Sequence, residues 1–83
     1  MYIIYTQKSC GFCVMAKELL EEHSHKYTEI AIDEDNKAKN FVKSFAKTVP
    51  QIFYKKQLIG GYQELIEYLD SSIVHRVLQV YPI

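Results

Sequence analysis

The sequence predicts an α/β protein in which helices flank a small mixed β-sheet, with the element order β-α-β-α-β-β-α. Short runs rich in β-branched and aromatic residues alternate with longer stretches in which apolar residues recur at helical spacing. The first strand, helix and strand form a β-α-β unit, which implies a parallel pair of strands. Two later strands around a turn add an antiparallel edge, so the sheet is mixed.

The β-α-β unit occupies the first 32 residues. The segment "YIIYT" (2–6) is short, β-branched and aromatic, as a buried strand is. Apolar residues then recur at helical spacing between Met15 and Leu20, which predicts a helix over residues 11–24. The segment "YTEIAI" (27–32) alternates in the manner of a second strand.

A second helix follows the acidic segment "DEDN" (33–36), which is typical of a helix start. Its apolar positions recur at amphipathic spacing, and they are Ala38, Phe41, Val42, Phe45 and Ala46.

The rest of the chain predicts a hairpin and more helix. Two short strands lie in "QIFYKKQLIGG" (51–61), around a turn at Lys55 to Gln57. A glycine pair ends the hairpin, and "YQELIEYL" (62–69) restores helical spacing. The tail "SSIVHRVLQVYPI" (71–83) is consistent with a short helix that begins after Ser71 or Ser72.

Length and composition narrow the class of protein. The 83 residues suffice for one small domain (1–83), and 48% of them are hydrophobic. Ten basic residues balance ten acidic ones, so we expect no nucleic-acid partner. The start "MYIIYTQKSC" is too briefly apolar for a signal peptide or a membrane span. We therefore expect a cytoplasmic location, no membrane association and, without a large apolar stripe, a monomer.

The two cysteines, Cys10 and Cys13, stand at the start of the first predicted helix. Unpaired N–H groups and the helix dipole stabilise a thiolate at the helix cap, so we expect the pKa of Cys10 to lie below the usual value of about 8.5. Cys13 lies one turn further, more buried and within reach of a disulfide to Cys10. An exposed nucleophile beside a buried resolving thiol suits thiol–disulfide exchange.

Two other interpretations of the cysteine pair are weaker. A zinc site needs two further ligands, and the nearest candidates are His23 and His25. Because His23 is ten residues beyond Cys13, it lies about 15 Å along the helix, and H-x-H lacks finger spacing. We expect no metal site. Chance packing of two small residues is the other alternative, but C-x-x-C beside a β-α-β pattern favours redox chemistry.

Three segments together resemble the glutaredoxin family, and the likeness extends over almost the whole chain. "YTQKSCGFC" (5–13) resembles the family's strand-to-active-site turn, and "TVPQIF" (48–53) resembles its loop before the third strand. "IGG" (59–61) before a helix resembles its second glutathione-contact segment. The resemblance implies the minimal thioredoxin fold, a cis bond between Val49 and Pro50, and catalysis by Cys10 and Cys13. The size resembles the smallest bacterial and phage members.

The same resemblance implies a glutathione site. Pro50 favours an extended Val49 whose backbone can pair with a peptide, and the N–H groups of Tyr62 and Gln63 open a helix that can bind a carboxylate. The expected glutathione-binding residues are Lys8, Phe12, Lys39, Thr48, Val49, Pro50, Gly61, Tyr62 and Gln63.

The chain departs from the family pattern at several of these positions. Gln7 stands where the family has its basic residue, with Lys8 one place later, and Gly11-Phe12 replaces the common Pro-Tyr. Gln63 offers a neutral amide where many members have an acidic or hydroxyl group. The segment before Thr48 lacks the family's glycine, which obscures which lysine of the second helix meets glutathione; we expect Lys39, with Lys37 as the second choice.

The expected function is that of a glutathione-dependent thiol–disulfide oxidoreductase. Its partners would be glutathione, as co-substrate, and disulfide-containing or glutathionylated proteins, with ribonucleotide reductase among them. Three alternatives stay open. They are an iron–sulfur-cluster-binding dimer, a redoxin reduced by thioredoxin reductase, and a redox-inactive binding module, against which the two cysteines argue.

Overall fold

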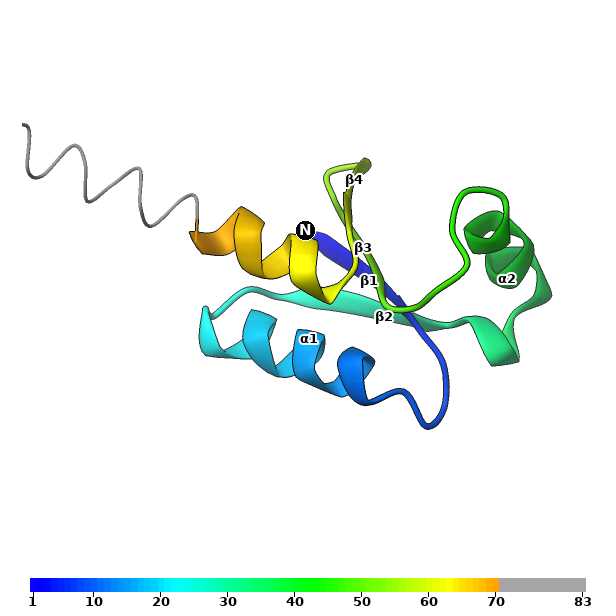
Figure 1. Cartoon of the computed structure of the whole chain (residues 1–83), viewed down its shortest axis with the longest axis horizontal. Helices are drawn as coiled ribbons and strands as arrows, with labels where there is room; N and C mark the ends of the chain where they lie inside the picture. The colour runs from blue at the N-terminus through cyan, green and yellow to red at the C-terminus, as the bar shows by residue number, and fades with distance from the viewer. Residues whose placement is uncertain (71–83) are drawn as a thin grey trace, which may run out of the picture.

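A four-stranded sheet with the strand order β2-β1-β3-β4 organises the fold (Figure 1). The computed structural model describes residues 1–70, so the helix expected after Ser71 or Ser72 lies outside the described residues. The elements are β1 (Tyr2–Thr6), α1 (Gly11–Glu22), β2 (Tyr27–Ala31), the 3-10 helix η1 (Ile32–Glu34), α2 (Asn36–Lys43), β3 (Gln51–Tyr54) and β4 (Gln57–Gly60). Residues 62–70 are helical.

Strand pairing confirms the predicted mixed sheet. β1 pairs in parallel with β2, in a register that places Tyr2 opposite Tyr27, and antiparallel with β3. β3 continues antiparallel into β4. The α/β fold with the order β-α-β-α-β-β-α is therefore the one that the apolar pattern predicts.

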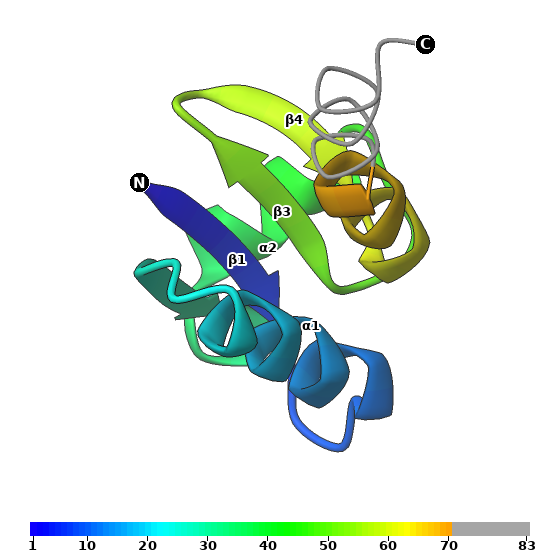
Figure 2. The same ribbon diagram turned by 90° about the vertical axis from the view of Figure 1, so that its left-hand side faces the viewer.

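Helices cover the sheet on both faces (Figure 2). α1 and the helix over residues 62–70 lie on one face, and α2 lies on the other. The main core lies between the sheet and the pair formed by α1 and the helix over residues 62–70. It consists of Tyr2, Ile4, Ala16, Leu20, Ile52, Leu65 and Leu69. A smaller cluster of Ile32, Ala38 and Val42 holds α2 against the second face.

The first two helices end earlier than the sequence pattern predicts. α1 ends at Glu22 rather than at residue 24, because Ser24 takes a left-handed φ of 59°. The N–H groups of Ser24 and His25 then donate to the carbonyls of Glu21 and Leu20, which is a Schellman termination.

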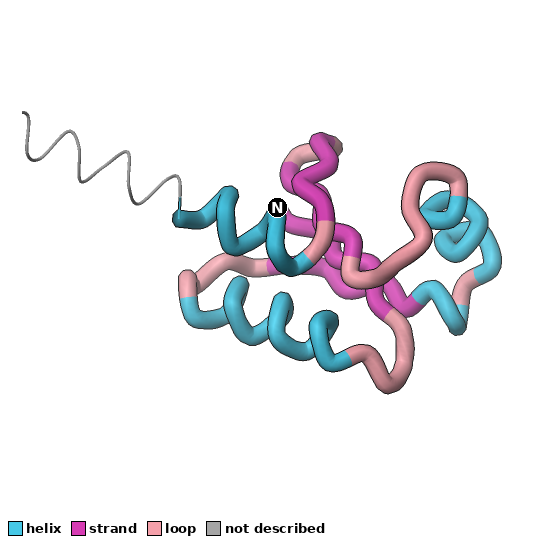
Figure 3. The backbone as a smooth tube through the Cα atoms, viewed as in Figure 1, coloured by secondary structure: helices cyan, strands magenta, loops and turns pink. Residues whose placement is uncertain are grey.

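α2 ends at Lys43, although the apolar spacing continues to Ala46. The Ser44 hydroxyl donates to the Phe41 carbonyl, at 2.6 Å, and so occupies an acceptor of the last helical turn. The loop over residues 44–50, drawn pink in Figure 3, then carries the chain back to the sheet.

The turn between β3 and β4 has two lysines at its centre. Lys55 and Lys56 take φ values of 50° and 69°, a pair of left-handed residues typical of a type I′ hairpin turn. Such turns favour Asn-Gly. The left-handed conformation costs most other residues roughly 1–2 kcal/mol each.

Replacing the second turn residue by glycine, Lys56→Gly, is expected to stabilise the protein by about 1 kcal/mol. Urea unfolding monitored by circular dichroism measures the change. Lys26→Gly is the matched control, because Lys26 has no such φ, and glycine there only adds backbone freedom to the unfolded chain. A Lys56→Gly protein less stable than the wild type would contradict the strain argument.

Within residues 1–70, no helix is both long enough and apolar enough to cross a membrane.

Candidate active site

Cys10 is the N-cap of α1. Ser9 turns the chain with a left-handed φ of 56°, and Cys10 follows in an extended conformation. Its sulfur accepts a hydrogen bond from the backbone N–H of Cys13, at 3.1 Å. After reduction the same donor and the helix dipole would favour a thiolate at Cys10.

The two cysteines form a disulfide, with their Cα atoms 5.2 Å apart. Cys10 is partly exposed at the surface, whereas Cys13 is only 2% exposed between α1 and the sheet. An attacking molecule can therefore reach the first sulfur and not the second. This asymmetry is the one that exchange with a resolving cysteine requires.

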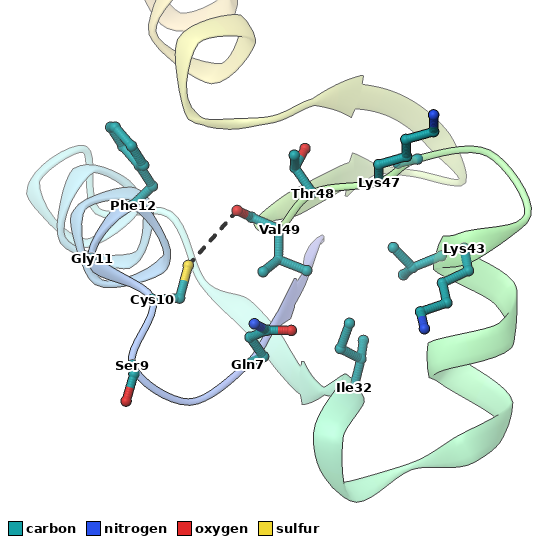
Figure 4. A pocket seen from close by; sticks show the side chains of 12 residues that line it. Gln7, Ser9, Cys10, Gly11, Phe12, Ile32, Lys43, Lys47, Thr48 and Val49 are labelled. Carbon is teal, nitrogen blue, oxygen red and sulfur yellow. Dashed lines mark hydrogen bonds between the residues drawn. The ribbon is translucent and has the colours of Figure 1, made fainter.

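The loop before β3 approaches Cys10 from the other side. The bond between Val49 and Pro50 is cis, which confirms the expectation from the family resemblance. The Val49 carbonyl oxygen lies 3.7 Å from the Cys10 sulfur, the contact drawn as a dashed line in Figure 4. The Gln51 side chain donates to the Thr48 carbonyl at 3.0 Å and fastens the loop.

The glycine pair starts the next helix. Gly60 has a φ of 124°, and a Cβ atom there would lie 2.8 Å from Glu64 Cγ, so a side chain is excluded. Gly61 accepts from the Leu65 N–H at 2.9 Å, and its own N–H donates to Glu64 Oε1 at 2.8 Å. Because Glu64 satisfies that N–H, the N–H groups of Tyr62 and Gln63 are the next donors at the helix start.

These segments meet in two adjoining pockets. The first, of about 350 Å³, contains seven of the nine expected glutathione-binding residues. Its lining is Phe12, Thr48, Val49, Pro50, Gly61, Tyr62, Gln63 and Glu64.

The second pocket, of about 400 Å³, contains Cys10 and shares Phe12, Thr48 and Val49 with the first. Lys43 and Lys47 line it across from Cys10 (Figure 4). The two pockets thus form one groove, with Val49 in its middle.

Lys8 and Lys39 are placed differently from the other seven. Lys8 lines a third pocket, on the far side of the active-site turn, and its backbone N–H donates to Asp33 at 3.3 Å. Gln7 lines both pockets that contain Cys10. Of the lysines on α2, Lys43 lines the groove, whereas Lys39, one turn earlier, does not.

Sequence reasoning missed Lys43 and Lys47. A signal was present, because Lys39, Lys43 and Lys47 recur at intervals of four, and Lys39 and Lys43 stand one turn apart on α2. Lys47 lies beyond the end of α2, so its place beside the pocket depends on the path of residues 44–50, which spacing alone does not give.

A polar network lies behind the cysteines. The buried Thr6 hydroxyl donates to Glu29 Oε2 at 2.7 Å, and the Lys17 ammonium pairs with the same oxygen at 3.2 Å. The hydrogen bond from Thr6 lowers the pKa of Glu29 below its usual value; Lys17 adds to this effect, and partial burial opposes it. Glu29 is consequently ionised at neutral pH. Within residues 1–70, no three His, Cys, Asp or Glu side chains gather as a metal site would require.

Several known proteins resemble this chain in sequence. A family model described as Glutaredoxin matches residues 2–59. Glutaredoxin 1 of Rickettsia conorii is 36% identical over 84 residues, which cover 96% of this chain and 82% of the relative.

Solved structures give the same result. The crystal structure of glutaredoxin 1 from Francisella tularensis, complexed with cacodylate, is similar with a TM-score of 0.74 and 32% identity, over 87% of this chain and 94% of that one. The buckwheat glutaredoxin–glutathione complex has a TM-score of 0.74 at 23% identity, over 88% of this chain and 72% of that one, and shares the fold.

Proposed function

Since this chain belongs to the glutaredoxin family of thiol–disulfide oxidoreductases, we propose that it reduces protein disulfides and glutathione mixed disulfides with glutathione as the electron source. We place this activity in the cytoplasm and in a monomer. Disulfide-containing or glutathionylated proteins are the proposed substrates, with ribonucleotide reductase as one candidate. The groove on both sides of Val49 carries the proposal, because it suits a short peptide with a carboxylate at each end and a sulfur in the middle.

Each end of the groove offers a partner for one carboxylate of glutathione. Lys43 supplies a positive charge at the end near α2, and we assign it to the glycine carboxylate. Lys39 stands one helical turn earlier and Lys8 lies beyond the active-site turn, so both are secondary candidates. The N–H groups of Tyr62 and Gln63 serve the γ-glutamyl carboxylate at the other end. The glutathione complex of the buckwheat relative supports this choice of ligand.

The middle of the groove places the sulfur. The Val49 backbone pairs with the peptide, as an added strand would. Phe12, 60% exposed, and Tyr62 stand with their rings 5.8 Å apart and form an apolar wall beside it. Glutathione held in this way brings its thiol to Cys10.

Reduction of a protein disulfide uses both cysteines. The Cys10 thiolate attacks one substrate sulfur, forms a mixed disulfide and releases the other substrate sulfur as a thiolate, which takes up a proton. Cys13 then loses its proton and attacks the Cys10 sulfur, which releases the second substrate thiol and leaves the Cys10–Cys13 disulfide. Two glutathione molecules restore the dithiol and leave as glutathione disulfide.

Removal of glutathione from a protein uses Cys10 alone. Its thiolate attacks the glutathione sulfur of the mixed disulfide and releases the protein thiol. The thiolate of a second glutathione attacks the glutathione sulfur of the resulting Cys10–glutathione disulfide, which regenerates the Cys10 thiolate and releases glutathione disulfide.

The proposed intermediate can be trapped. In a Cys13→Ser protein incubated with glutathione disulfide, intact-mass spectrometry is expected to show one glutathione per chain, attached to Cys10. The adduct should accumulate because no second thiol can expel it. A protein that stays unmodified, while a small uncharged disulfide does react with Cys10, would contradict glutathione binding in the groove.

A further inference from the structure

The resolving cysteine is buried, although it has to lose a proton. Cys13 must become a thiolate before it can attack the Cys10 sulfur. Cys10 is partly exposed at the N-cap of α1, but Cys13 is only 2% exposed, so bulk water hardly reaches its sulfur. A group inside the protein that takes up the Cys13 proton would speed the resolving step.

Thr6 faces the turn of α1 that carries Cys13. Ile4 and Thr6 are successive buried residues on one face of β1, and Ile4 belongs to the core that also contains Ala16 and Leu20 of α1. Because α1 runs back along β1 (Figure 1), its first turn lies at the end of the strand where Thr6 stands. Thr6 and Cys13, each 2% exposed, both line the third pocket, which has a volume of about 480 Å³.

The Thr6 hydroxyl forms a hydrogen bond whose direction is fixed. It donates to Glu29 Oε2 at 2.7 Å, and an ionised carboxylate can only accept. The Thr6 oxygen therefore keeps its lone pairs for another donor, and the Cys13 S–H at the same pocket is a donor of that kind. Thr6 can thus accept a proton on one side while it donates one on the other.

Glu29 connects the buried hydroxyl with solvent, because its side chain is 39% exposed. The hydrogen bond from Thr6 lowers the pKa of Glu29, Lys17 adds to this effect, and partial burial opposes it. Glu29 is therefore ionised at neutral pH and passes a proton on to water readily. Lys17, one helical turn beyond Cys13, holds both carboxylate oxygens, at 3.2 and 3.3 Å. The other titratable side chains near Glu29 or along the pocket are Lys8, Tyr27, Asp33 and Glu34.

From the burial of Cys13, the direction of the Thr6 hydrogen bond and the exposed carboxylate behind it, we propose that Thr6 and Glu29 form a proton path for the resolving cysteine. The Cys13 thiol gives its proton to the Thr6 oxygen while the Thr6 hydroxyl proton passes to Glu29, which releases it to water. The electron pair left on Cys13 attacks the Cys10 sulfur, and the bond from Cys10 to the substrate sulfur breaks, which releases a substrate thiolate. The inference rests on the proposed function, because it concerns that function's second step.

The test follows the two cysteines separately in one reaction. Reduced protein is mixed in a stopped-flow instrument with an equimolar amount of dithiodipyridine, a small uncharged disulfide. Attack by Cys10 releases one thiopyridone and leaves a mixed disulfide. Attack by Cys13 then releases the second thiopyridone and forms the Cys10–Cys13 disulfide. The first phase shows that a variant is folded and that Cys10 is active, and the second phase measures the resolving step.

Two near-isosteric variants interrupt the proton path. Thr6→Val removes the hydroxyl, and Glu29→Gln keeps a hydrogen-bond acceptor that cannot take up a proton. At neutral pH we expect each to slow the second phase about tenfold or more, and Thr6→Ser, which keeps the hydroxyl, to stay close to the wild type. The defect should disappear at alkaline pH, where hydroxide removes the thiol proton. Glu34→Gln is the matched charge control, because Glu34 lines the same pocket whereas the Thr6 hydroxyl donates to Glu29.

Three results would overturn the inference. The first is a second phase of wild-type rate in Thr6→Val. The second is a faster second phase in Glu29→Gln, because loss of a nearby negative charge would then favour the thiolate without any proton transfer. The third is a slow second phase that persists at alkaline pH, which would mean that Cys13 is misplaced rather than short of a proton acceptor. Absence of both phases in the wild type would instead refute the proposed function, in which Cys10 is the nucleophile.

Discussion

The Cys10→Ser protein is expected to reduce neither protein disulfides nor glutathione mixed disulfides above the uncatalysed background. A serine hydroxyl stays protonated at neutral pH and cannot replace a thiolate as the nucleophile, even at the N-cap of α1. The measurement is NADPH consumption with glutathione and glutathione reductase, using one substrate of each kind.

The Cys13→Ser protein is the matched comparison, because it removes the other sulfur of the same disulfide. We expect it to keep turnover of glutathione mixed disulfides, which needs Cys10 alone, and to lose reduction of protein disulfides, which needs resolution by Cys13. The reverse pattern, with Cys13→Ser inactive on mixed disulfides and Cys10→Ser active, would exchange the two roles. The 2% exposure of Cys13 argues against that assignment.

Truncation of Leu65 is expected to destabilise the protein by about 2–5 kcal/mol, a large part of the roughly 5–15 kcal/mol that holds a domain folded. Leu65 is fully buried and packs the helix over residues 62–70 onto the sheet, in the cluster that contains Ile4, Leu20 and Ile52. Urea unfolding of Leu65→Ala measures the loss. The same helix begins at the groove, so we also expect a higher KM for glutathione.

Leu58→Ala is the control for Leu65→Ala. The chemical change is the same, but Leu58 is 46% exposed on β4, so the loss should be within about 0.5 kcal/mol. Equal losses in the two variants would mean that Leu65 does not hold the helix to the sheet as its burial indicates.

Much of the active site could be predicted because its parts depend on local rules. A cysteine immediately before a helical pattern is an N-cap, and Cys10 is one. A proline favours an extended conformation in the residue before it, which can then pair with a peptide. Val49 and Pro50 both line the groove. The glycine pair marks the end of the hairpin in the sequence, and Gly60 has both the positive φ and the crowding by Glu64 that favour glycine there.

The differences arise where tertiary packing or an unusual local conformation decides. Ser24 ends α1 with a left-handed φ, which a serine in the sequence does not predict. Phe41 and Phe45 fit an amphipathic pattern, yet the buried residues of α2 are Ala38 and Val42. One short helix does not cover this face of the sheet, so the two phenylalanines stay exposed. The choice among Lys39, Lys43 and Lys47 likewise depends on where residues 44–50 place the end of α2 against Cys10.

The central claim is that glutathione, bound in the groove at Val49, supplies the electrons. The most direct test follows reduction of a protein disulfide by the wild-type protein in two parallel reactions. One contains NADPH, glutathione and glutathione reductase, and the other contains NADPH and thioredoxin reductase. We predict saturable, glutathione-dependent turnover in the first and background in the second. Turnover in the second alone would contradict the account and make this chain a redoxin of the thioredoxin-reductase type, with a groove that does not hold glutathione.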